Sequence, residues 1–209
     1  MWDPIKKDHL TVGQYKTKDI LLNEVMKDID FYEESGGGVT LSGGEVLTQA
    51  PFAMEFLKAL KAQGIHTACE TTGFAKPSVF NPFITAVDLL FFDMKHHDQA
   101  QHLAGTGVSN ELILENLAFA VKNHPNLMVR IPIIPQYNAT LEDAESFATL
   151  LKAQGVHQIE LLPFHQLGER KYEYLGKTYE PFDLPQLHTE DLAAHQKIFT
   201  KHGINCTIK

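Results

Sequence analysis

Residues 35–45, SGGGVTLSGGE, constrain the fold more than any other stretch of the sequence. They predict a short apolar strand over 39–41 that is bounded by glycine on both sides. Glycine adopts positive φ at little cost, so the runs at 36–38 and 43–44 can turn the chain sharply into the strand and out of it. The simplest interpretation is two glycine turns around a buried strand.

The second glycine run also has a chemical interpretation. Gly43 and Gly44 would let a ligand lie against bare backbone N–H groups, and the Glu45 carboxylate beside them suits a cation or an amine. No Gly-Lys-Ser/Thr follows, so the pattern is not that of a P-loop, and the glycine spacing differs from a dinucleotide fingerprint.

Apolar strands alternate with amphipathic helices along the rest of the chain. The pattern predicts strands at 65–70, 87–94, 127–134, 158–162 and 204–208, and helices at 18–34, 51–63, 77–85, 111–122, 141–154 and 190–201. Asn110, Thr140 and Thr189 are expected to cap the last three helices. Pro132 and Pro135 are expected to interrupt the strand that contains the first of them.

This alternation predicts the α/β class with a parallel sheet, either doubly wound or a (β/α) barrel. We expect a single domain over 1–209, with a long polar loop at 168–187. Five successive strands end in segments that carry charged or polar side chains: SGGE, CETTG, FDMKH, RIPIIP and LPFHQLG. Because barrel enzymes carry their active sites at the carboxyl ends of the strands, these segments favour the barrel.

The strand ends supply six candidate site residues, namely Glu45, Glu70, Asp93, Lys95, Arg130 and His165. Opposite charges around one mouth suit a zwitterionic ligand. These residues also have structural interpretations: Glu70 and Asp93 as helix caps, Lys95 and Arg130 as solvated charges, and His165 as a ring packed on Phe164.

Composition limits the classes of partner. The net charge of −8 argues against nucleic acid and against an anionic membrane surface, because both prefer a basic face. No apolar run has the length of a membrane span and no signal sequence opens the chain, so we expect a cytoplasmic protein. Cys69 and Cys206 make no disulfide framework, and Cys69 is expected to pack as a small hydrophobe. His96, His97 and His102 are interpreted as a solvated polar loop.

The series SGGGVTLSGGE, GIHTACETTGF, FFDMKH, VRIPIIP and IELLPFHQLG resembles the activating enzymes of glycyl radical enzymes. This family, typified by the pyruvate formate-lyase activating enzyme, belongs to the radical S-adenosylmethionine superfamily. The resemblance implies a partial (β/α)6 TIM-like barrel with S-adenosylmethionine and a [4Fe-4S] cluster. It also implies a 5′-deoxyadenosyl radical that takes hydrogen from a backbone glycine of a partner, either pyruvate formate-lyase or a related lyase, dehydratase or decarboxylase.

The cofactor-binding residues implied by the resemblance are Gly43, Gly44, Glu45, Glu70, Thr71, Asp93, Met94, Lys95, Arg130 and His165. The SGGE step would hold the methionine amine, and Lys95 the methionine carboxylate. Glu70, where the family has Asp, would lie near the amine and near a monovalent cation. Arg130 would meet the polar rim of the ligand and His165 its adenosine end.

The sequence departs from the family at the cluster. The family binds the cluster through a Cys-x3-Cys-x2-Cys run, which in its members lies upstream of the point where this sequence begins, together with the first barrel strand. The run is absent from these residues. We therefore expect no metal ligands and no catalytic competence in this chain alone, and an exposed parallel edge at the strand 39–41, open to pairing or dimerisation.

Some features leave alternatives open. Residues 10–17 resemble the segment that follows a ferredoxin-like insert in some members, whereas Trp2 and Asp3 resemble members without it. Two other classes of protein also fit. One is a cluster-free module that binds S-adenosylmethionine or a partner. The other is a metal-dependent (β/α) barrel enzyme with Glu45, Glu70, Asp93 and His165 as ligands.

Overall fold

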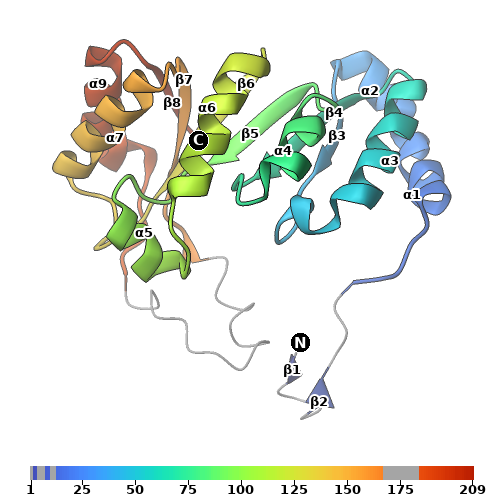
Figure 1. Cartoon of the computed structure of the whole chain (residues 1–209), viewed down its shortest axis with the longest axis horizontal. Coiled ribbons are helices and arrows are strands. Elements are labelled where there is room, and N and C mark those ends of the chain that lie inside the picture. The colour runs from blue at the N-terminus through green and yellow to red at the C-terminus, as the bar shows by residue number, and fades with distance from the viewer. Residues whose placement is uncertain (1, 4–7, 10–12, 167–183) are drawn as a thin grey trace.

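The computed structural model describes residues 2–3, 8–9, 13–166 and 184–209. Six parallel strands form one sheet in the order β3-β4-β5-β6-β7-β8 (Figure 1). Their bounds are β3 Gly38–Leu41, β4 His66–Thr71, β5 Leu89–Asp93, β6 Leu127–Ile133, β7 Gln158–Pro163 and β8 Asn205–Ile208. Within the described ranges, β3 and β8 are edge strands that do not pair with each other, so the sheet is open, as in the expected partial barrel.

Helices connect the strands and follow the sheet from α9 at one end to α1 and α3 at the other (Figure 1). Their bounds are α1 Lys18–Val25, α2 Ile29–Ser35, α3 Ala50–Ala62, α4 Pro77–Ile84, α5 Gln99–Thr106, α6 Glu111–Asn123, α7 Leu141–Ala153 and α9 Ala193–Lys201. Short 3-10 helices are η1 Met26–Asp28, η2 Val46–Gln49 and η5 Thr189–Leu192. Of the helices described, none is long and apolar enough to cross a membrane.

The two faces of the sheet differ in chemistry because successive side chains of a strand point to opposite faces. One face is apolar and buried, and carries Cys69, Leu90, Phe92, Val129, Ile131, Ile159 and Leu161 in the main core. The alternate positions on the same strands include Glu70, Phe91, Arg130 and Glu160. The helices cover the apolar face, so the charged residues gather on the other one.

Several expectations about local structure were wrong. An unpredicted helix, α5, begins after Asp98, whose carboxylate accepts from the Gln101 N–H at 2.8 Å. The strand β6 runs through Pro132 without a break. Only Gly36 of the first glycine run has positive φ, at 65°. The first predicted helix is divided into α1, η1 and α2.

The predicted caps had mixed outcomes. Thr140 and Asp143 form a full capping box at α7, as expected for Thr140. Asn110 precedes α6 but makes no side-chain cap, and its amide NH₂ group donates to the carbonyls of His96 and His97. Thr189 begins η5 rather than capping it.

The strand β3 is an edge of the sheet in the described part of the chain, as expected. The two-residue strands β1, Trp2–Asp3, and β2, Asp8–His9, pair antiparallel with each other rather than with β3. Most of the expected polar loop at 168–187 lies outside the described residues.

Candidate functional site

A row of alternating charges crosses the polar face of the sheet. Arg130 on β6 donates from Nη1 to Glu70 Oε1 on β4 at 2.7 Å and from Nε to Glu160 Oε2 on β7 at 2.9 Å. Lys209 Nζ lies 3.2 Å from the other Glu160 oxygen, and Ser42 Oγ donates to Glu70 Oε2 at 2.6 Å. Five strands or strand ends are thereby linked by one polar network.

Arg130 is the centre of this network. Its guanidinium lies 4.2 Å from the centroid of the Phe91 ring on β5, the strand that it crosses to reach Glu70. Burial lowers the pKa of Arg130, but the bonds to Glu160 and Glu70 raise it more, so the guanidinium stays charged. The Ser42 hydroxyl, followed by Arg130, lowers the pKa of Glu70 despite partial burial, so Glu70 is ionised at neutral pH.

The step after β5 supplies a second ion pair. Lys95 Nζ donates to Asp93 Oδ2 at 2.8 Å, and both side chains are partly exposed. Asp93 is in register with Arg130, so this pair lies next to the charge row. Met94 is 1% exposed and belongs to the core, so its side chain does not lie with those of its two neighbours.

The SGGE turn is held by its glutamate. The Glu45 carboxylate accepts from the Thr71 hydroxyl at 2.7 Å, from the Thr72 hydroxyl at 2.7 Å and from the Thr72 N–H at 2.9 Å. It also accepts from the Leu47 N–H at 3.1 Å, at the start of η2. Glu45 therefore ties the end of β3 to the end of β4, a role that the sequence did not indicate.

Gly43 and Gly44 are exposed, and a Cβ added at either would meet no atom within 4 Å. Their backbone faces open space beside Ser42 and Glu45. His165 follows β7 and is exposed as well. Most of the candidate residues thus lie at or just past the carboxyl ends of their strands, where Met94 and Thr71 are buried at 1% and 3% exposure. Arg130, predicted at a strand end, lies instead in the middle of β6, in register with Asp93.

Two buried amides that sequence reasoning missed support the loops of this edge. Asn138 donates to the carbonyls of Lys95 and Pro132, each at 2.8 Å, and accepts from the Ile134 N–H at 2.7 Å. Asn116 on α6 donates to the carbonyls of Gly73 and Ala75. The sequence shows that asparagines stand at these positions, but it does not show which distant backbone groups they bond.

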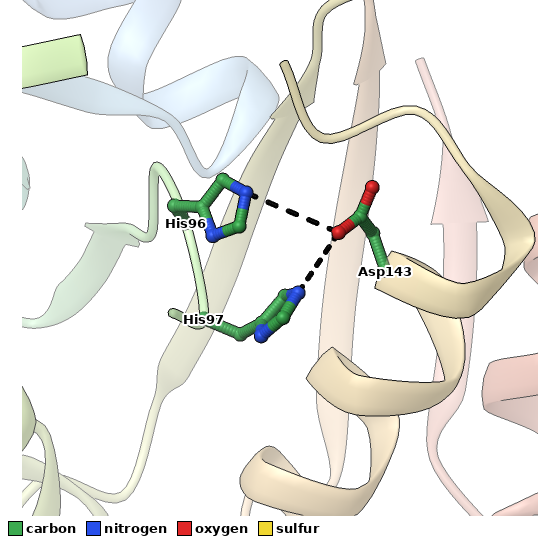
Figure 2. A group of neighbouring side chains, drawn as sticks. All are labelled: His96, His97 and Asp143. Carbon is green, nitrogen blue, oxygen red and sulfur yellow. Dashed lines mark hydrogen bonds and ion pairs between the residues drawn. The ribbon is translucent and has the colours of Figure 1, made fainter. Parts of the chain in front are cut away.

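A second polar group is formed by His96 and His97, which follow β5, and Asp143 in the first turn of α7 (Figure 2). His97 Nε2 is 2.9 Å and His96 Nε2 3.9 Å from Asp143 Oδ1. His96 and His102 are each only 2% exposed, so the interpretation as a solvated loop was wrong. The His96 ring packs against the rings of Tyr137 and Phe147, whereas His102 is a buried residue of the unpredicted helix α5.

The hydrogen bonds of this group disfavour a metal ion. The Asp98 N–H donates to His96 Nδ1 at 3.0 Å, so the proton of the neutral ring sits on Nε2, which lies 3.1 Å from the Tyr137 carbonyl. Burial, then the charge of His97, lowers the pKa of His96. A metal ion binds an unprotonated ring nitrogen. In His96 that nitrogen is Nδ1, which already accepts the Asp98 N–H and is therefore not free for a metal.

The cysteines of the sequence do not fit an iron–sulfur cluster. Cys69 and Cys206 are buried at 0% and 6% exposure, and burial raises the pKa of each thiol to about 12. Clusters need thiolates, which neither residue supplies. Cys69 packs in the core, as expected.

Comparisons with known proteins identify the family of the chain. The radical SAM superfamily model matches residues 7–151. The chain is 40% identical over 201 residues to the choline trimethylamine-lyase activating enzyme of Oleidesulfovibrio alaskensis, covering 94% of this chain and 65% of the relative. It is 39% identical over 197 residues to the pyruvate formate-lyase 2-activating enzyme of Escherichia coli, covering 94% and 68%. It therefore spans about two thirds of the length of these relatives.

A solved structure shows the same fold. A domain of a pyruvate-formate lyase-activating enzyme from Bacteroides vulgatus superposes with a TM-score of 0.69 and 30% identity, covering 83% of this chain and 99% of that one. The order of the motifs, the open parallel sheet and these relatives agree. The chain belongs to the radical SAM superfamily, and within it to the activating enzymes of glycyl radical enzymes.

Proposed function

We propose that this chain is the S-adenosylmethionine-binding part of an activating enzyme that acts on a glycyl radical enzyme. The observation that carries the proposal is the row of Glu70, Arg130 and Glu160 beside the open backbone of Gly43 and Gly44. Charges of both signs next to exposed N–H groups suit a zwitterion.

The residues of the edge have distinct roles in this proposal. Glu70 and the SGGE backbone receive the methionine amine, while Lys95 meets the carboxylate. Glu45 acts indirectly, because its carboxylate holds the turn against Thr71 and Thr72.

The other candidate residues complete the proposed site. Arg130 lies at the polar rim of the ligand and His165 at its adenosine end. A monovalent cation would take oxygen ligands from Glu70, Thr71 and Asp93. Met94 contributes through its backbone position, because its side chain is buried.

The [4Fe-4S] cluster of the superfamily supplies the radical chemistry when it is bound with S-adenosylmethionine. Because neither Cys69 nor Cys206 fits that cluster, we propose that these 209 residues by themselves do not abstract hydrogen. The partner is a glycyl radical enzyme, of which the relatives' names include lyases, a dehydratase and a decarboxylase. A location in the cytoplasm, with neither nucleic acid nor a membrane as partner, fits the net charge of −8.

Two measurements test this function. Calorimetric titration with S-adenosylmethionine should show binding that is weakened by Lys95→Met and unchanged by Glu145→Gln, a carboxylate paired with His202 away from the sheet edge. Absence of binding would overturn the proposal. Anaerobic reconstitution with iron and sulfide should give no stoichiometric cluster spectrum, and a stoichiometric one would contradict the second half of the proposal.

The alternative of a metal-dependent barrel gains nothing from the geometry. The Glu45 carboxylate is filled by threonine donors, and Glu70 is paired with Arg130. Both would have to give up these partners to bind a divalent ion.

A further inference from the structure

The Glu160 carboxylate has no assigned role and is nearly inaccessible. Its side chain is 5% exposed, although it lies on the polar face of the sheet. A buried carboxylate is costly unless cations compensate it, and here Arg130 and Lys209 do so. Lys209 is 65% exposed and contributes little, so Arg130 is the partner that matters.

The register explains why Glu160 controls Arg130 in particular. The two residues are paired across β6 and β7, so their side chains leave the same face side by side. The Glu160 carboxylate accepts a hydrogen bond from the Nε–H of Arg130, which fixes the plane of the guanidinium. With that plane fixed over Phe91, Nη1 reaches Glu70 two strands away.

From this chain of contacts, we propose that Glu160 is a positioning residue for the S-adenosylmethionine site. It holds Arg130 across β5, and Arg130 in turn holds Glu70 at the carboxyl edge. Among the described residues, the remaining N–H groups of the Arg130 guanidinium have no protein acceptor and stay available to a ligand oxygen. This inference rests on the proposed function, since it assigns Glu160 to the same site.

A double-mutant cycle separates positioning from a merely structural role. Glu160→Gln keeps the size and one acceptor but removes the charge, and Arg130→Gln removes the group that it positions. We expect Glu160→Gln to raise the dissociation constant for S-adenosylmethionine about tenfold, because a charge-assisted bond is lost. In the Arg130→Gln background the same change should have less than about a twofold effect, since the two residues act in series. Glu145→Gln is the matched control and should change nothing.

The Arg130 Nε–H signal in a ¹H–¹⁵N spectrum, assigned by its absence in Arg130→Gln, gives a readout independent of activity. We expect it to be protected from exchange in the unsubstituted chain and to lose protection in Glu160→Gln. An unchanged signal, or an equal loss of binding in both backgrounds, would overturn the proposal. Failure of the proposed function gives a different result, because the unsubstituted chain would then not bind S-adenosylmethionine at all. The Arg130 Nε–H signal would still show whether Glu160 positions Arg130.

Discussion

The Glu45 carboxylate and Thr72 are joined by two hydrogen bonds, one from the Thr72 hydroxyl at 2.7 Å and one from its N–H at 2.9 Å. Because 27 residues separate the two in sequence, this contact closes the loop between β3 and β4 at the carboxyl edge. The glutamate of the SGGE step thus shapes the site through the backbone that it holds.

Replacement of Glu45 by alanine should therefore destabilise the fold. It would leave the buried Thr71 hydroxyl and the Thr72 N–H without their acceptor, at a cost of about 1–3 kcal/mol. Urea unfolding would measure the loss. Glu55→Ala, at an exposed position of α3, is the control and should stay within about 0.5 kcal/mol. Equal stabilities of the two variants would show that the contact contributes nothing.

Alanine substitutions at the two glycines should separate backbone strain from ligand access. Gly43 has φ of 131°, a conformation that alanine rarely adopts, so Gly43→Ala should cost about 1–3 kcal/mol of stability. Gly44 has no such φ and space for a Cβ, so Gly44→Ala should fold with stability within about 0.5 kcal/mol. If the ligand lies against this backbone, Gly44→Ala should still weaken S-adenosylmethionine binding in a titration. Unchanged binding would place the ligand elsewhere.

Much of the fold was predictable because apolar runs report burial. Both ends of each of the strands β4, β5, β6 and β7 lie within two residues of the predicted bounds. The helix α5 was missed because its sequence, QAQHLAGT, has a weak apolar pattern. Asp98 was the signal that could have found it, as a good N-cap directly before that helix.

The positions of the candidate residues were more predictable than their contacts. Parallel strands bring their carboxyl ends to one edge, so the candidates at the strand ends gather there. Whether Glu45 faces a ligand or Thr72 depends on a non-local contact that one sequence does not specify. Glu160 was missed because its pairing with Arg130 depends on strand register, and in the strand it reads as a single charge among apolar residues.

Asn138 should be more important for stability than its position in a loop indicates. Its amide, 1% exposed, makes three hydrogen bonds that hold the chain after β5 to the end of β6. Asn138→Ala leaves those backbone groups unpaired, and we expect a loss of about 2–4 kcal/mol in urea unfolding. Asn123→Ala, which removes one exposed bond at the end of α6, should cost less than about 1 kcal/mol. The reverse order would contradict the assigned role of Asn138.

Stability should fall at acid pH through Asp143. Burial raises the pKa of this carboxyl, but hydrogen bonds from Thr140 and His97 lower it more, so the folded-state pKa lies below its ordinary value. A lowered carboxyl pKa contributes stability that is present above the unfolded-state value of about 3.9 and is lost as pH falls through the folded-state value. Replacement by Asn removes the titration. The difference in unfolding free energy between the unsubstituted chain and Asp143→Asn should therefore shrink progressively below about pH 5. Urea unfolding at a series of pH values measures it, with Asp30→Asn, an exposed position on α2, as the control. A difference independent of pH would mean that Asp143 stabilises α7 by shape rather than by its charge.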